Sequence, residues 1–269
     1  EIYTLSLHDA LPISIHLLFH AAPRSADRRG SLQNGANGAR MAAHPRSRMP
    51  GKIFRFGPTP EHRAQHLFVF LHGSGATPKS MIPIAFRFQA RFPSAALVVP
   101  SGFASSEIDG EGQQWYSSRG LTDDNRVARI EAILPRVEAL VRREQTNCGV
   151  PVERTVLIGF SQGGTVALEA VKQLPGLAGA VVAYSARFAR LPQNGARLAS
   201  RIHLVHGEYD AVVSRVHSER AARVLAALHV PVTLDIVEHL GHALSHHAIC
   251  LGSLRLLQGI YEGRRATLH

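Results

Sequence analysis

The chain has 269 residues, of which 45% are hydrophobic and 19% are charged, and its formal net charge is +10. This composition is ordinary for a globular protein and supplies enough apolar material for one sizeable core. No apolar stretch reaches the roughly 18 residues that a membrane-spanning helix needs. The arginines that carry most of the charge are spread along the chain, which favours a solvated surface over a nucleic-acid interface.

The two cysteines, Cys148 and Cys250, do not make a disulfide framework in a chain of this length. They fit a reduced, cytoplasmic setting, and they fit one optional bridge equally well. The apolar run 11–19 is short, contains His16 and lacks a basic region before it. We therefore expect no secretory signal and a cytoplasmic location.

The first 48 residues differ in character from the rest. Residues 24–48 are rich in Arg, Ala, Gly, Ser, Asn and Pro and have no helical or strand period, which predicts disorder or a translated upstream region. Residues 1–14 (EIYTLSLHDALPIS) resemble a translated sequencing adapter. We therefore expect the natural start at Met49 and a single catalytic domain over residues 49–269.

Strands and helices alternate beyond this point. The predicted strands are short apolar runs, at 66–71, 95–99, 155–160, 179–184, 202–206 and 233–237. The predicted helices have apolar residues at helical spacing, at 124–143 (interrupted by Pro135), 163–173, 216–228 and 243–258. This alternation predicts an α/β fold whose mostly parallel sheet is covered on both faces. Because ligand sites of such sheets lie at the carboxyl ends of strands, functional residues should follow strands directly.

Residues 159–163 match the pattern G-x-S-x-G, with a predicted strand before them and a predicted helix after them. In a nucleophile elbow, this context holds the serine in a strained turn that exposes its Oγ. Glycines two before and two after Ser161 are needed because the strand and helix backbones would pass too close for a Cβ. A Gly-rich turn whose serine only caps the helix is the alternative. The context favours Ser161 as a nucleophile.

A serine hydroxyl needs a general base, and a carboxylate usually holds that base in one tautomer. Enzymes with a nucleophile elbow carry these residues in the order Ser, then Asp or Glu, then His. After Ser161, the strand 202–206 leads into the loop that contains Asp210. Asp210 is therefore the expected acid, with Glu208 as its competitor in the same loop.

The expected base, His242, follows the strand 233–237 and stands directly before the last predicted helix. Three neighbouring histidines compete with it, namely His239, His246 and His247. The four-residue spacing of His242 and His246 would also suit a metal site on a helix. No third carboxylate or cysteine falls in register with them, so we expect no metal.

The loop after the strand 66–71 reads His72-Gly73-Ser74-Gly75-Ala76. Acyl transfer develops negative charge on a carbonyl oxygen, which two fixed backbone N–H groups stabilise. One should come from Gln162, after the nucleophile, and the other from this early loop, where Ser74 is the best candidate. The small residues let the backbone approach a substrate, and we expect His72 and Gly73 to contact it.

Together these residues resemble the bacterial carboxylesterase/phospholipase esterases, which are similar to acyl-protein thioesterases and related to dienelactone hydrolases. The motifs that carry the resemblance extend over about residues 54–257 and are FLHGSGA (70–76), GQQWYS (112–117), LTDDNR (121–126), IGFSQGG (158–164), HGEYDAVV (206–213) and LDIVEHLGHAL (234–244). The enterobacterial esterases with a GRQW(Y/F)S segment are the most similar group. The resemblance implies the α/β-hydrolase fold without a large lid.

The resemblance also assigns roles. It implies that Ser161, Asp210 and His242 form a catalytic triad and that Ser74 and Gln162 supply the oxyanion donors. It further implies that Trp115 and Tyr116 line the acyl pocket. Many relatives have a larger apolar residue where this chain has Ser74, which should change the pocket but not a backbone donor. Dienelactone hydrolases have Cys where this chain has Ser161, so that activity is not expected.

The sequence therefore predicts a serine carboxylesterase that works through an acyl-enzyme and needs no cofactor. The expected partner is a small-molecule ester or thioester, and some members of the resembled family pair as homodimers. The alternatives are an acyl-protein thioesterase or a lysophospholipase with the same triad, because the triad alone does not select the substrate. A binding protein that kept the fold without the chemistry is the remaining alternative.

Overall fold

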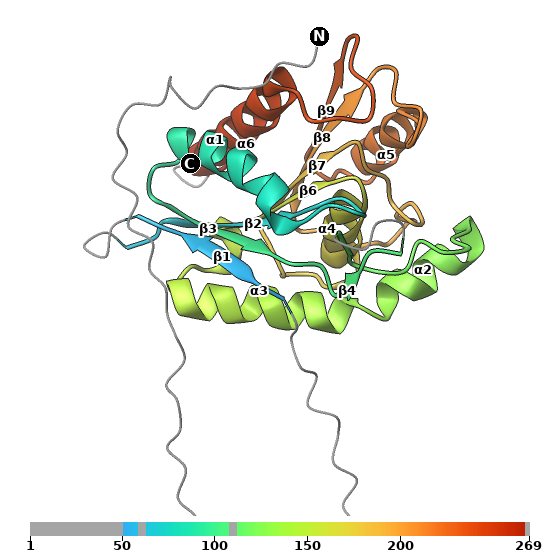
Figure 1. Ribbon diagram of the computed structural model, residues 1–269. Helices are drawn as coiled ribbons and strands as arrows, with labels where there is room; N and C mark the ends of the chain where they lie inside the picture. The colour runs from blue at the N-terminus through green and yellow to red at the C-terminus, as the bar shows by residue number, and fades with distance from the viewer. Residues whose placement is uncertain (1–50, 59–62, 108–111, 267–269) are drawn as a thin grey trace, which may run out of the picture. The chain divides into compact units, whose positions relative to one another are not determined.

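The computed structural model describes residues 51–58, 63–107 and 112–266 (Figure 1). The predictions made for residues 1–48 lie outside these ranges. The prediction of one catalytic domain over residues 49–269 is not tested by the fold and stays a prediction.

A seven-stranded sheet forms the centre of the fold. Its strands are β1 (Ile53–Phe56), β2 (His66–Leu71), β3 (Ala95–Pro100), β6 (Thr155–Phe160), β7 (Ala180–Tyr184), β8 (Arg201–Gly207) and β9 (Val232–Val237). Their order in the sheet is β1-β3-β2-β6-β7-β8-β9. Only β1 runs antiparallel to its neighbour, β3, and all other neighbours are parallel. Two short strands, β4 (Ala104–Ser105) and β5 (Gln113–Gln114), form a separate ribbon.

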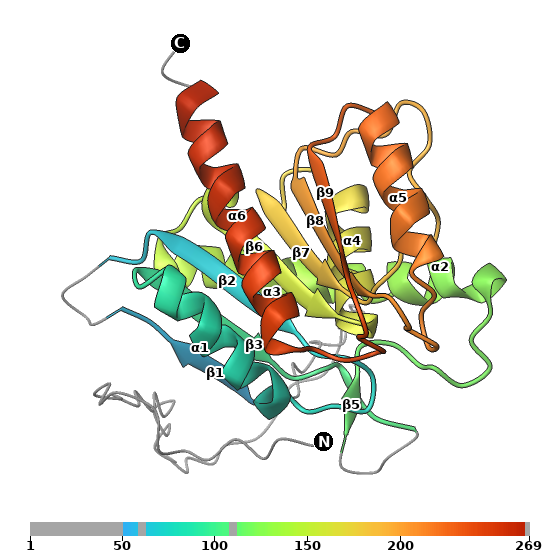
Figure 2. The same ribbon diagram turned by 90° about the horizontal axis from the view of Figure 1, so that it is seen from above.

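Helices cover both faces of this sheet (Figures 1 and 2). The short turn η2 (Pro78–Met81), α1 (Ile82–Arg91) and α6 (His246–Ala266) pack on one face. The opposite face is covered by α2 (Asp123–Glu131), α3 (Leu134–Cys148), α4 (Gln162–Gln173) and α5 (Val216–Ala227). A further turn, η3 (Val152–Arg154), leads into β6.

The apolar run of β2 shows why the two layers form. Phe68 and Phe70 point to one face and contact the ring of Phe88 on α1, edge to face. Their neighbours Leu67 and Val69 belong to the buried cluster of the opposite face. Side chains alternate across a strand, so a strand buried on both faces must be apolar throughout.

All six predicted strands are present, and the α/β-hydrolase fold is confirmed. The predicted helix 124–143 is wrong as one helix, because α2 ends at Glu131 and α3 begins at Leu134. Pro135 causes the break, since it has no N–H and its ring clashes with the carbonyl four residues earlier, whereas it fits the first turn of α3. The predicted helix 243–258 begins three residues later, at His246, and continues to Ala266. The strand β1, the helix α1 and the β4–β5 ribbon were not predicted from the sequence.

One buried histidine of the sheet, His203, makes the stability of the fold depend on pH. His203 on β8 is 2% exposed, its Nδ1 lies 2.9 Å from the Thr233 hydroxyl oxygen, and its Nε2 has no hydrogen-bond partner among the described residues. Burial, with the Arg201 charge adding to it, lowers the pKa of His203 to about 4. The ring is therefore neutral in the folded protein at neutral pH.

We expect acid to destabilise the fold through His203. The unfolded chain takes up this proton near pH 6.5, whereas the folded protein takes it up only near pH 4. The free energy of unfolding that His203 contributes is therefore complete above about pH 6.5, and it has been lost once the pH has fallen through about 4. The loss should approach about 3 kcal/mol. Urea unfolding of wild type and His203→Leu from pH 7 to pH 4 measures it. Parallel curves for the two proteins would contradict the assignment.

Candidate active site

Ser161 lies at a sharp turn between β6 and α4, and its backbone has φ 52° and ψ −115°. A positive φ is uncommon for a residue other than glycine and marks a strained turn. The turn is held because the Ser161 N–H donates to the carbonyl of Tyr184, at the end of β7, over 2.9 Å. This is the backbone conformation of a nucleophile elbow.

The two glycines of the motif are required by close backbone contacts. A Cβ on Gly159 would lie 2.5 Å from the Gly163 carbonyl, and a Cβ on Gly163 would lie 2.2 Å from the carbonyl oxygen of Leu71. Both distances are far below van der Waals contact. The prediction that the strand and helix backbones pass too close for a side chain is confirmed.

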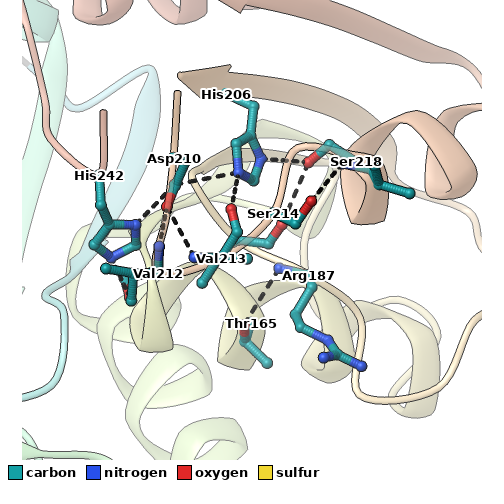
Figure 3. Close-up of polar contacts among 12 residues, drawn as sticks. Thr165, Arg187, His206, Asp210, Val212, Val213, Ser214, Ser218 and His242 are labelled. Carbon is teal, nitrogen blue, oxygen red and sulfur yellow. Dashed lines mark hydrogen bonds and ion pairs between the residues drawn. The ribbon is translucent and has the colours of Figure 1, made fainter. Parts of the chain in front are cut away.

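A continuous hydrogen-bonded chain joins Ser161, His242 and Asp210. His242 Nδ1 lies 2.8 Å from Asp210 Oδ2 (Figure 3). His242 Nε2 lies 3.0 Å from Ser161 Oγ. Because the carboxylate only accepts, Nδ1 carries the proton and Nε2 is free to accept from the serine hydroxyl. The three residues stand at the carboxyl ends of β6, β8 and β9, which meet at one edge of the parallel sheet.

The Asp210 carboxylate is saturated with donors. Its Oδ1 accepts the N–H groups of Val212 (3.0 Å) and Val213 (2.8 Å), and its Oδ2 faces His242 and, at 3.2 Å, His206 Nε2. Burial works to raise the pKa of Asp210, but the hydrogen bonds from His242, Val213 and Val212 outweigh burial and hold the pKa below its usual value. The side chain is therefore an anion at neutral pH, although it is fully buried.

Three of the four competing residues have other partners. Glu208 accepts the backbone N–H of His239 over 3.3 Å and faces Arg215. The His239 ring lies at a tilt against the Tyr209 ring, and His246 on α6 contacts Arg87 and Cys250. Across the described ranges, no group of three or more His, Cys, Asp and Glu side chains is arranged to hold a metal ion.

The loop after β2 lies beside Ser161. A Cβ on Gly73 would stand 3.5 Å from the Cβ of Ser161, so the backbones of the two segments are neighbours. The backbone N–H groups of Ser74 and Gln162 donate to no other residue in the part of the chain that the structure describes. Their positions next to the serine hydroxyl suit two donors to a substrate oxygen.

His72 is buried and serves the loop rather than a substrate. Gly102 N–H donates to its Nε2 over 2.9 Å, so the proton sits on Nδ1, which lies 2.8 Å from the Gly73 carbonyl oxygen. Burial lowers the pKa of His72 and keeps the ring neutral. The fixed Gly73 carbonyl sets the plane of the Gly73–Ser74 peptide, and with it the direction of the Ser74 N–H.

Trp115 and Tyr116 are only 1% and 5% exposed, so they present little surface to an acyl chain. Trp115 makes two hydrogen bonds within the protein. Its indole N–H donates to the His72 carbonyl, and its backbone N–H donates to Gln162 Oε1, both over 2.8 Å. The Gln162 side chain also donates to the Tyr116 carbonyl over 2.9 Å. This segment therefore ties the loop after β2 to the start of α4 from beneath.

His206 is a residue of the site that was not predicted from the sequence. It is the last-but-one residue of β8, it is fully buried, and its Nε2 lies 2.7 Å from the Val213 carbonyl oxygen as well as 3.2 Å from Asp210. The available signal was its place at a strand end four residues before the expected acid. Most buried histidines satisfy only local structure, so that signal alone could not separate it from His203.

Fold and geometry together define a hydrolase of the α/β-hydrolase class. The phospholipase/carboxylesterase family model matches residues 58–250, and the chain belongs to this family. It is an enzyme that acts on carboxylic esters. Within the described ranges, no helix is long and apolar enough to span a bilayer.

Relatives and solved structures agree with this family. The esterase YpfH of Escherichia coli (strain K12) is 43% identical over 191 residues, which are 71% of this chain and 82% of that protein. Acyl-protein thioesterase 1 of Cryptococcus neoformans is 27% identical over 45% of this chain and 53% of that protein. The crystal structure of esterase PE8 has a TM-score of 0.70 at 26% identity, over 77% of this chain and 97% of that one.

The tie made by the Gln162 side chain is testable. Gln162→Ala leaves the buried Trp115 N–H and Tyr116 carbonyl without partners, so we expect the free energy of unfolding to fall by about 2–4 kcal/mol. Gln173→Ala, on the same helix but bonded only to Glu169, should cost less than about 1 kcal/mol. Equal losses in urea unfolding would argue against the tie.

Proposed function

We propose that this chain is a carboxylesterase that uses Ser161 as nucleophile, His242 as general base and Asp210 as the orienting acid. The observation that carries the proposal is the unbroken chain of hydrogen bonds from Ser161 Oγ through both nitrogens of His242 to Asp210. A neutral imidazole that accepts from the serine and donates to a buried carboxylate is prepared to take one proton. The catalytic unit in this proposal is one domain over residues 49–269.

In the first step, Ser161 Oγ attacks the ester carbonyl while His242 Nε2 takes the hydroxyl proton. The negative charge that develops on the carbonyl oxygen is stabilised by the backbone N–H groups of Ser74 and Gln162. The imidazolium is stabilised by the Asp210 anion. His242 then gives its proton to the leaving alcohol, and the acyl group stays on Ser161.

In the second step, water replaces the alcohol. His242 takes a proton from the water as it attacks the acyl-enzyme, and the same two N–H groups stabilise the second oxyanion. Collapse of this intermediate returns the proton to Ser161 Oγ and releases the carboxylic acid. Every proton passes through His242 Nε2, and the mechanism needs no cofactor.

A thioester is the second candidate substrate, because the leaving thiol would take the same proton from His242. The similarity to an acyl-protein thioesterase supports this alternative, and a lysophospholipase would use the same residues. The absence of a predicted long lid favours short or soluble acyl chains. A homodimeric state and a cytoplasmic location stay predictions.

The nucleophile is tested with Ser161→Ala. Hydrolysis of p-nitrophenyl acetate, butyrate and octanoate should fall by at least about 10³-fold, because removal of one triad member abolishes the concerted proton transfer. Labelling of the protein by a fluorophosphonate should be lost as well.

The matched control is Ser200→Ala. Ser200 is also buried, but it lies at the amino end of β8, and among the described residues its hydroxyl donates to the Ala178 carbonyl alone. The Ser200→Ala protein should hydrolyse the same esters and react with the fluorophosphonate like the wild type. A folded wild-type protein that hydrolyses none of these esters and resists the fluorophosphonate would overturn the proposal in favour of a binding role.

A further inference from the structure

His206 lies behind the triad, with its imidazole between two oxygens that carry no proton. Its Nε2 is 2.7 Å from the Val213 carbonyl oxygen and 3.2 Å from Asp210 Oδ2 (Figure 3). Both oxygens can only accept, so Nε2 must carry a hydrogen that it shares between them. The ring is fully buried.

The other ring nitrogen accepts a hydrogen bond. His206 Nδ1 lies 2.7 Å from the Ser218 hydroxyl oxygen on α5, which is also 3.3 Å from the Ala186 carbonyl oxygen. Burial lowers the pKa of His206 and keeps the ring neutral, and because Nε2 carries the proton, Nδ1 accepts the hydroxyl proton of Ser218. This arrangement is a neutral imidazole with its proton on Nε2.

The neighbouring charges do not change this state. The titratable groups around the ring are Asp210 on its own loop, His242 from the loop after β9, and His217 on α5. Burial lowers the pKa of His206, and a positive charge on His242 lowers it further. The ring therefore stays neutral when His242 takes up its proton.

We infer that His206 is a positioning residue that acts through Asp210: its Nε2–H clamps the turn 210–213 and aims Asp210 Oδ2 at His242. The inference rests on the proposed triad. Asp210 Oδ1 is held by two backbone N–H groups of this turn, and His206 holds both the Val213 carbonyl of the turn and the opposite carboxylate oxygen. The carboxylate thereby has one orientation.

This clamp matters because Asp210 must stay in place while His242 changes charge. A protonated imidazole attracts the carboxylate more strongly than a neutral one, and a carboxylate that turns toward it would move the base away from Ser161. His206 donates a second hydrogen bond to Asp210 Oδ2, and its own ring does not take up the proton that His242 accepts. Catalysis depends on such geometry to within about 0.5 Å.

The test compares His206→Leu and His206→Gln with a matched control. Leucine removes the donor, whereas the glutamine amide can replace the Nε2–H. We expect His206→Leu to lower kcat for p-nitrophenyl butyrate by about 10- to 100-fold with KM changed less than about 3-fold, and His206→Gln to recover part of kcat. The control, His203→Leu, removes a buried imidazole of the same strand that does not touch Asp210, and it should keep the wild-type kcat.

A double-mutant cycle asks whether His206 acts through Asp210. In the Asp210→Asn background, His206→Leu should lower kcat by less than a further 3-fold or so, because the carboxylate that it positions is gone. Multiplicative losses, or a His206→Leu enzyme with normal kcat, would overturn the inference. If Asp210→Asn alone leaves kcat unchanged, the proposed triad itself has failed, which is a distinguishable result.

The wild-type protein gives a test that no folding defect can obscure. A ¹H–¹⁵N spectrum of the ¹⁵N-histidine-labelled full chain should show His206 protonated at Nε2 alone from pH 6 to pH 9. A proton on Nδ1, or a ring that charges near pH 7, would overturn the inference even if His206→Leu does not fold.

Discussion

The close approach of β6, α4 and the loop after β2 is the constraint on which the rest of the site depends. The backbones meet where Gly159 and Gly163 stand, and no side chain fits between them. This packing forces the chain through a positive φ at Ser161 and lifts its hydroxyl away from the sheet. It also brings the loop after β2 against the serine. The position of the hydroxyl and of the two candidate oxyanion donors therefore follows from a single packing contact.

Neutral buried histidines stabilise the loops around this contact. His72 fixes the Gly73 carbonyl, and His206 fixes the Val213 carbonyl and Asp210. Burial penalises the charged ring, so each of these imidazoles keeps one tautomer and behaves as a rigid donor–acceptor pair. The His242 side chain differs from both in being 17% exposed.

Membership of the phospholipase/carboxylesterase family identifies the class of reaction, whereas the choice of substrate depends on the surface around Ser161. Trp115 and Tyr116, which family resemblance assigns to the acyl pocket, are buried beneath the loop in this chain. The Trp115 ring lies against the rings of His72 and Phe103.

Several features followed from the sequence alone, because they depend on local patterns. The six apolar strands, the elbow glycines and the order Ser161, Asp210, His242 are all readable from residue types and spacing. The sequence indicated an interruption at Pro135 but did not show that the chain forms two separate helices there, since two helices satisfy the same apolar spacing as one. The edge strand β1 was not predicted because its four residues are only partly buried or exposed, and its antiparallel pairing with β3 and its Arg55–Glu144 ion pair are tertiary contacts.

Tertiary structure alone decided which residues meet. Four histidines crowd residues 239–247, and only packing selects His242, whose ring lies between residues 81 and 32 positions away in the chain. The same holds for Asp210 over Glu208, and for the different surroundings of His203 and His206 on one strand. Distances of a few ångströms between segments far apart in sequence determine these pairings, and local residue patterns do not encode them.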